Sequence, residues 1–105
     1  MSSLAPKLHP DRFTAMSPLM AAIVAYVLGE SWTEPGIAEI AVGEQDGLVY
    51  IRKEGDAGFD GLQSLSDLRS NWNRLLDAAE LTPDERREAM RLFNQRVAIV
   101  PGTSL

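Results

Sequence analysis

The sequence predicts a small α+β domain, ordered as helix, β-hairpin and αα-hairpin. Three observations lead to this fold class. No charged side chain occurs from Phe13 to Gly29, two alternating segments flank an Asp46-Gly47 turn signal, and two amphipathic stretches meet at Thr82-Pro83. Apolar residues spaced three and four apart indicate a helix, whereas strict alternation of apolar and polar residues indicates a strand.

The length of 105 residues fits one domain, and we treat residues 1–105 as a single domain. A hydrophobic content of 45% is ordinary for a globular protein and too high for a disordered one. One modest hydrophobic core is therefore expected.

Residues 1–12 show no periodic pattern and contain two prolines. They predict an extended N-terminal arm, held against the domain by Leu4, Leu8 and Phe13. His9, the single histidine, lies in this arm, and chain ends are usually mobile. The arm therefore offers no scaffold for a histidine-based site.

Residues 17–28 predict the first helix, which has clear start and stop signals. Ser17 is a good N-cap, and Pro18 suits the first helical position because its missing N–H is not needed there. Gly29 supplies the left-handed stop.

The interior of this helix, from Leu19 to Leu28, is apolar at every position except for the hydroxyl of Tyr26. A helix that is apolar on all sides must be covered on all sides. Either the rest of the domain or a second subunit covers it.

Residues 37–53 carry the pattern of a β-hairpin. Asp46-Gly47 suits a two-residue turn, which needs a positive φ at both positions. This turn predicts the strand pairs Val42 with Ile51, Glu44 with Val49, and Ile40 with Lys53. The inner face then takes Ile40, Val42, Val49 and Ile51, and the outer face takes Glu39, Tyr50 and Arg52.

Two strands alone are marginal in water, so the hairpin needs a helix beneath it or a further strand. Ala98-Ile-Val100 could supply a short C-terminal third strand. Pairing across a dimer axis would serve equally well.

Residues 54–61 form a loop by composition, with three glycines and three acids. A calcium loop of the EF-hand type wants oxygen ligands at alternate positions and a closing Glu at position twelve. Ala57 to Phe59 interrupts that alternation, and position twelve counted from Asp56 is Asp67, at a helix start. We therefore interpret this segment as a solvated linker without a metal.

Residues 64–80 and 83–96 predict two helices that form an αα-hairpin. Ser64 caps the first helix, and Thr82, Pro83 and Glu85 form a capping box at the second. The apolar stripes are Leu65, Leu68, Trp72, Leu75, Leu76 and Ala79 on the first helix, and Ala89, Met90, Phe93 and Val97 on the second. We expect the uncharged first helix to pack between the sheet and this αα-hairpin.

The residue inventory gives little support to catalysis. The chain has no cysteine and one histidine, which excludes thiolate chemistry and the usual transition-metal sites. No phosphate-binding loop or dinucleotide fingerprint is present, and no carboxylates stand at a spacing that fixes their geometry. We therefore expect no enzyme activity, no cofactor and no metal.

The uncharged stretch is too short to span a membrane, since about 20 apolar residues are needed. Lys7 and Arg12 precede it as in a signal peptide, but Asp11, Pro18 and the lack of a small-residue cleavage site near Gly29 argue against one. The sequence therefore predicts a cytoplasmic protein with no membrane contact.

The expected function is protein–protein interaction as a homodimer, with another protein as a further partner. Trp32, Glu39, Tyr50 and Arg52 combine the aromatic and charged residues that interfaces favour, and they form the candidate interface. Free strand edges and the abundant apolar surface of residues 13–29 support this interpretation.

The alternative is a nucleic-acid-associated regulator that uses the αα-hairpin. Its arginines would be Arg69, Arg74, Arg87 and Arg91. Against it, the net charge is −5, and residues 1–63 carry all of it, with four basic and nine acidic residues. Acidic residues also begin the second helix of the hairpin, where a recognition helix would meet phosphates.

Overall fold

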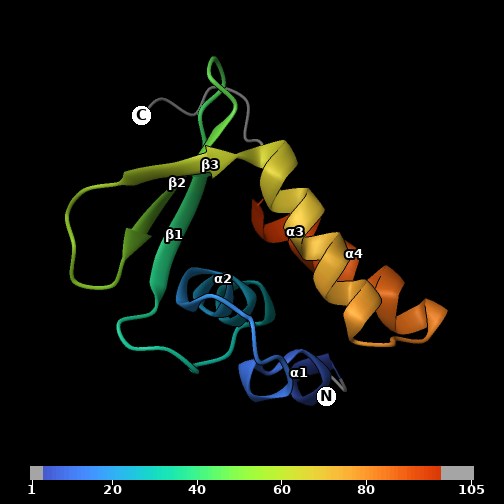
Figure 1. Cartoon of the computed structure of the whole chain (residues 1–105). Helices are drawn as coiled ribbons and strands as arrows, with labels where there is room; N and C mark the ends of the chain where they lie inside the picture. Colours follow the sequence, from blue (N-terminus) through green and yellow to red (C-terminus); the bar gives the residue numbers. More distant parts are fainter. Residues whose placement is uncertain (1–3, 98–105) are drawn as a thin grey trace.

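The computed structural model describes residues 4–97 and confirms the α+β class. The helical elements are α1 (Leu4–Leu8), the 3₁₀ turn η1 (Pro10–Arg12), α2 (Pro18–Leu28), α3 (Leu65–Ala78) and α4 (Pro83–Val97). The strands are β1 (Ile37–Val42), β2 (Leu48–Lys53) and β3 (Asp60–Ser64), which form an antiparallel sheet in the order β1-β2-β3 (Figure 1).

Helix α2 has the predicted caps and lies at the centre of the fold. The Ser17 side chain accepts a hydrogen bond from the Met20 amide, and Gly29 takes the left-handed conformation at φ 73°. The helix contacts β1 on one side and α4 on another. Its residues Ala21, Ile23 and Val27 are 8%, 0% and 2% exposed, so one copy of the chain covers the helix interior.

The N-terminal arm is a correction to the sequence prediction. Residues 4–8 form helix α1 and residues 10–12 form η1, whereas the sequence predicts an extended chain. Leu4 and Leu8 lie one helical turn apart and are both buried in the core, and α1 packs on α2. Because Pro6 falls within the first turn of α1, its missing N–H costs no helical hydrogen bond.

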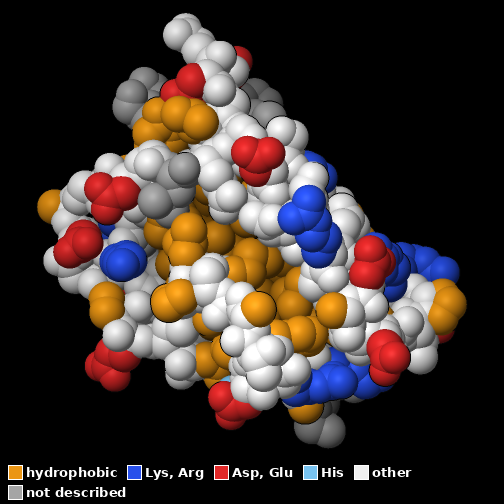
Figure 2. All heavy atoms as spheres, viewed as in Figure 1, with side chains coloured by type: hydrophobic (Ala, Val, Ile, Leu, Met, Phe, Trp, Pro, Cys, Tyr) orange, Lys and Arg blue, Asp and Glu red, His pale blue; other side chains and the backbone are white. Residues whose placement is uncertain are grey.

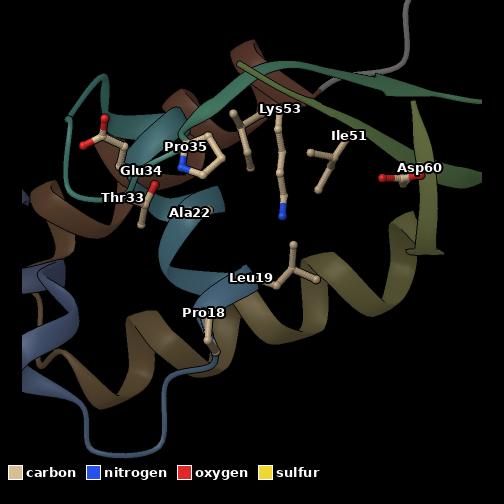
Figure 3. A pocket seen from close by; sticks show the side chains of 10 residues that line it. Pro18, Leu19, Ala22, Thr33, Glu34, Pro35, Ile51, Lys53 and Asp60 are labelled. Atoms are coloured by element: carbon tan, nitrogen blue, oxygen red, sulfur yellow. The ribbon is translucent and has the colours of Figure 1, made fainter. Parts of the chain in front are cut away.

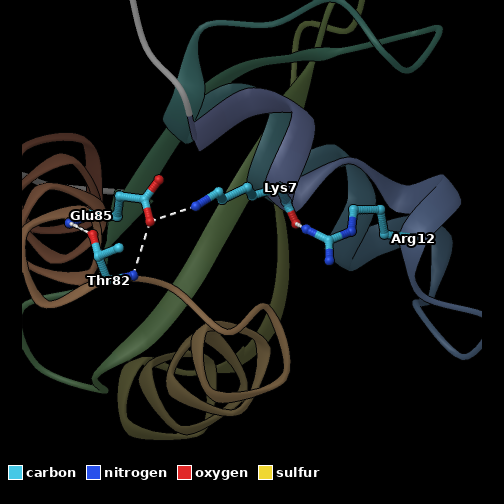
Figure 4. A network of polar contacts seen from close by, with 4 residues as sticks. All are labelled: Lys7, Arg12, Thr82 and Glu85. Carbon is cyan, nitrogen blue, oxygen red and sulfur yellow. Dashed lines mark hydrogen bonds and ion pairs between the residues drawn. The ribbon is translucent and has the colours of Figure 1, made fainter.

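An ion-pair network ties α1 to the start of α4 (Figure 4). Lys7 Nζ lies 2.6 Å from Glu85 Oε1, and the Arg12 guanidinium donates to the Lys7 carbonyl. Glu85 also closes the predicted capping box, because its carboxylate accepts from the Thr82 amide while its own amide donates to Thr82 Oγ1. Segments 78 positions apart are thus joined at one point.

This network predicts a loss of stability in acid. The Lys7 hydrogen bond, with the Thr82 amide, lowers the pKa of Glu85 from 4.5 to about 2. Since the folded pKa lies below the unfolded one, the stabilisation is present above about pH 4.5 and is lost as the pH falls toward 2. Glu85→Gln should lower the thermal midpoint at neutral pH and flatten its fall in acid.

Thermal unfolding followed by circular dichroism from pH 7 to pH 2.5 tests this, roughly spanning the titration of carboxyl groups. Glu30→Gln, at an exposed position, is the charge-matched control. If the two variants lose stability in parallel across this range, the network does not act as described.

The hairpin register differs from the predicted one. The observed pairs are Val42 with Val49, Ala41 with Tyr50, Ile40 with Ile51, Glu39 with Arg52 and Ile37 with Lys53. The connection is a four-residue loop, Glu44 to Gly47, closed by hydrogen bonds from the Gly43 amide to the Leu48 carbonyl and from the Gly47 amide to the Gly43 carbonyl. The predicted two-residue turn and its strand pairs are therefore wrong.

The predicted faces survive this error, because the pairing shifts by two residues and side chains alternate with a period of two. Ile40, Val42, Val49 and Ile51 are all buried on the inner face. Asp46 favours the wider loop, since its carboxylate accepts hydrogen bonds from the Leu48 amide and the Tyr50 hydroxyl.

The third strand of the sheet is β3, in a part of the chain that the sequence assigns to the loop 54–61 and to the helix cap. Asp60 and Gly61 begin this strand, and it pairs with β2. The predicted strand Ala98-Ile-Val100 lies outside the described residues. Ser64 ends β3 and caps α3, accepting a hydrogen bond from the Asp67 amide.

Helices α3 and α4 close the core. The buried residues of the two helices are Leu68, Trp72, Leu75, Leu76, Ala89, Phe93 and Val97, all on the predicted stripes. The Trp72 and Phe93 rings lie 5.2 Å apart and join the helices. Ion pairs within α4 join Asp84 to Arg87 at 2.8 Å and Glu88 to Arg91 at 2.6 Å.

Candidate interaction surfaces

Three of the four predicted interface residues lie together on the outer face of the sheet. Glu39 and Arg52 are opposite each other on β1 and β2, with Arg52 Nε 3.4 Å from Glu39 Oε1. Arg52 also donates to the Asp56 carbonyl. Tyr50 is the third residue and lies two positions before Arg52 on the same strand.

Tyr50 is held within the sheet by its neighbours. Its hydroxyl lies 2.6 Å from Asp46 Oδ2, and this hydrogen bond lowers the pKa of Asp46 and raises the pKa of Tyr50. The ring lies between Gly43 and Gly61, where added Cβ atoms would approach it to 3.1 and 2.9 Å. Because glycine has no Cβ, Gly43 and Gly61 leave room for the Tyr50 ring to lie across the strands.

Trp32 does not join the other three residues. Its ring lies 4.8 Å from the His9 ring, at an interplanar angle of 59°, and the indole packs at the edge of the core. The sequence prediction of one interface containing Trp32, Glu39, Tyr50 and Arg52 is therefore not met as a single surface. The three sheet residues already have partners within the chain, which leaves them little unsatisfied binding capacity.

A second candidate surface is apolar and lies between the segment before α2 and the outer side of α3. It is a hollow of about 510 Å³, which we call the Met16 groove. Its lining residues are Phe13, Ala15, Met16, Ser17 and Met20 from the first segment, and Asn71, Arg74, Leu75 and Ala78 from α3. Figure 2 shows hydrophobic side chains gathered across this face, between the sheet and the helices.

The Met16 groove exists because the uncharged stretch of sequence is longer than the helix inside it. Residues Phe13 to Ser17 precede α2, and no second layer of the chain covers them in the described structure. Phe13, Met16 and Met20 are half-buried, with one side on the core and the other in the groove. The sequence predicts abundant apolar surface in residues 13–29, but it places the candidate interface on the hairpin.

Arg74 is the one charged residue among the described residues that line the Met16 groove. Its side chain is exposed, and no hydrogen bond or ion pair engages it within residues 4–97. A cation without a partner beside an apolar surface can pair with an acidic group that an incoming partner brings.

The arginines of the nucleic-acid alternative are mostly engaged. Arg87 and Arg91 pair with Asp84 and Glu88, and Arg69 donates to the Asn94 side chain while lying 5.6 Å from the Phe93 ring. Arg74 alone of the four has no such contact in the described part of the chain. The structure therefore does not gather these cations into one unpaired basic surface.

Neither a candidate metal site nor a membrane-spanning helix occurs among the described residues. No group of three His, Cys, Asp or Glu side chains is placed to hold a metal ion, and no helix of residues 4–97 is long and apolar enough to cross a membrane. Comparison with protein-family models, with curated proteins and with solved structures gives no match for this chain.

Proposed function

We propose that this protein is a small, non-catalytic protein-interaction module that forms a homodimer through the Met16 groove. The observation that carries the proposal is the set of half-buried apolar side chains, Phe13, Met16 and Met20, around a hollow that residues 4–97 do not fill. Contiguous apolar surface of this kind marks interaction sites in proteins. Methionine suits such a surface because its unbranched side chain adapts to a partner's shape.

A second copy of the chain is the partner that fits the groove. In a twofold dimer the same surface of both copies is buried, so one apolar patch serves both partners. The buried interior of α2 needs no partner, so the support for a dimer comes from the groove rather than from that helix.

The groove would form the centre of a larger contact. A stable interface buries about 800 Å² on each partner. That is roughly an eighth of this chain's 6305 Å² of accessible surface.

Ala15→Lys and Met16→Lys are expected to convert a dimer into a monomer. Each places a second cation beside Arg74 in a groove without an acidic lining residue, where dimerisation would bury it unpaired. Multi-angle light scattering at micromolar to millimolar chain concentration should give twice the 11.5 kDa chain mass for the parent protein, and 11.5 kDa for both variants.

Gln95→Lys is the matched control, since it adds the same charge at an exposed position of α4 and should leave the dimer intact. A parent protein that stays at 11.5 kDa over the whole concentration range would refute the homodimer. A dimer that persists unchanged in both groove variants would place the contact on another surface.

The nucleic-acid regulator stays the second candidate, and Arg74 is the observation in its favour. The ion pairs of Arg87 and Arg91 would have to be broken before these side chains could contact phosphates. Such binding would weaken steeply with added salt, because it releases counterions. No binding to duplex DNA or RNA at low ionic strength would eliminate this candidate. Both candidates keep the cytoplasmic location that the sequence predicts.

A further inference from the structure

A second hollow, which we call the Lys53 pocket, lies between the start of α2, the Thr33–Pro35 segment and the inner face of the sheet. Its volume of about 550 Å³ falls in the range of small-molecule sites, roughly 300–1,000 Å³. The lining residues are Pro18, Leu19, Ala22, Thr33, Glu34, Pro35, Ile37, Ile51, Lys53 and Asp60.

The walls of the pocket are mostly apolar. Leu19 and Ala22 come from one side of α2, and Pro35 and Ile51 face them from the loop and from β2 (Figure 3). An aliphatic group placed there would contact carbon on several sides and leave water. Burial of this kind contributes about 0.8 kcal/mol for each CH₂ group.

Lys53 is an exposed residue and brings a positive charge to the edge of this apolar setting. It follows Val49 and Ile51 at alternate positions of β2, so the pleat places it on the inner face of the sheet with these core residues. Its ammonium group points into the pocket, between Leu19 and Pro35 (Figure 3). Within the described residues it forms no hydrogen bond or ion pair.

Thr33 is a second polar group without a partner on the same lining. Its hydroxyl oxygen is buried and has no hydrogen bond in the structure. Leaving a buried hydroxyl unpaired costs about 1–3 kcal/mol, so a ligand oxygen or a water molecule that reached it would recover this energy. The lining therefore includes two polar groups without partners in the described residues, of which the Lys53 ammonium group faces the pocket and the Thr33 oxygen is buried beneath its surface.

Two carboxylates set a limit on the charge of a ligand. Glu34 and Asp60 line the pocket, and neither pairs with Lys53. The Glu34 carboxylate points away from the centre (Figure 3). Both carboxylates repel any anion, and they repel a dianion such as a phosphate twice as strongly as a monoanion, so a ligand with a single carboxylate fits the one ammonium group better.

We infer that the Lys53 pocket binds an aliphatic monocarboxylate. The carboxylate pairs with the Lys53 ammonium group, and the aliphatic chain lies against Leu19, Ala22 and Ile51. This site is separate from the Met16 groove and does not depend on the homodimer.

Isothermal titration with octanoate, octanol and octylamine tests the assignment on the full chain. Octanoate is expected to bind at least about tenfold more tightly than the other two, because only its carboxylate forms an ion pair with the Lys53 ammonium group. Lys53→Met keeps the length of the side chain and removes the charge, and it should abolish this preference. Arg96→Met, which removes the same charge from an exposed position of α4, is the matched control and should bind octanoate like the parent.

Circular dichroism of both variants verifies that they fold. Equal affinity for octanoate and octanol, no binding of octanoate, or unchanged octanoate binding in Lys53→Met would overturn the inference. Light scattering on the same samples reports the dimer independently, so failure of one proposal is not mistaken for failure of the other.

Free acids and chain termini share this chemistry, and a further titration distinguishes them. A short peptide that ends in a free leucine carboxylate is compared with octanoate and with the same peptide amidated. Tighter binding of octanoate assigns the pocket to free acids, and tighter binding of the free peptide assigns it to a protein C-terminus. Binding of the amidated peptide as tightly as the free one would contradict the role of Lys53.

Discussion

Phe93→Ala is expected to lower the free energy of unfolding by about 3–5 kcal/mol, the usual cost of removing a buried aromatic ring. Phe93 is 0% exposed and faces Trp72 with ring centroids 5.2 Å apart. The Arg69 guanidinium lies 5.6 Å from the centroid of the Phe93 ring. Removing the Phe93 ring would therefore also remove the contact that holds this cation against the core. A domain of this size has a total stability of about 5–15 kcal/mol, so the variant would be close to unfolding.

Urea denaturation followed by tryptophan fluorescence measures this loss, because Trp72 reports on the same contact. Leu92→Ala is the control: it precedes Phe93 on α4 and is half-buried, so a clearly smaller loss is expected. A loss for Phe93→Ala no larger than that of Leu92→Ala would mean that the α3–α4 contact does not stabilise the core as the structure indicates.

Leu8→Ala is expected to cost about 2–5 kcal/mol, as for other buried leucines. The sequence predicts an arm at this position, where truncation of one side chain would cost little. In the structure Leu8 is 0% exposed and belongs to the same core cluster as Ile23 and Phe93. The size of the loss therefore distinguishes a docked helix α1 from a loose arm.

Pro6→Ala is the control for Leu8→Ala, because Pro6 is exposed on the same short helix. Its urea midpoint should stay close to that of the parent protein, since surface substitutions usually change stability by less than about 0.5 kcal/mol. If Leu8→Ala also stays within this range, α1 does not form part of the core in solution.

The candidate site was only partly predictable. The charge-free stretch from Phe13 to Gly29 indicates an excess of apolar surface, and the Met16 groove lies at its N-terminal end. Which part of that stretch stays uncovered depends on where α3 lies, because Arg74 and Leu75 form the opposite wall. The Lys53 pocket was not predicted at all, since the expected register placed Lys53 opposite Ile40 and gave no reason to search near Thr33.

Local sequence patterns correctly predict the structural features that depend on neighbouring residues along the chain. The Ser17 and Thr82 caps, the left-handed Gly29 and the apolar stripes of α3 and α4 are local, so residue spacing is enough to predict them. The faces of the hairpin also follow from alternation alone, whatever the register.

Structural features that depend on residues far away in the sequence become apparent only in the tertiary structure. Leu4 and Leu8 form a helix because α2 offers them an apolar surface, and a five-residue helix would be unstable in isolation. Residues Asp60 to Ser64 become a strand because β2 presents unpaired backbone groups beside them. In both cases the stabilising contact lies far away in the sequence, and no local pattern records it.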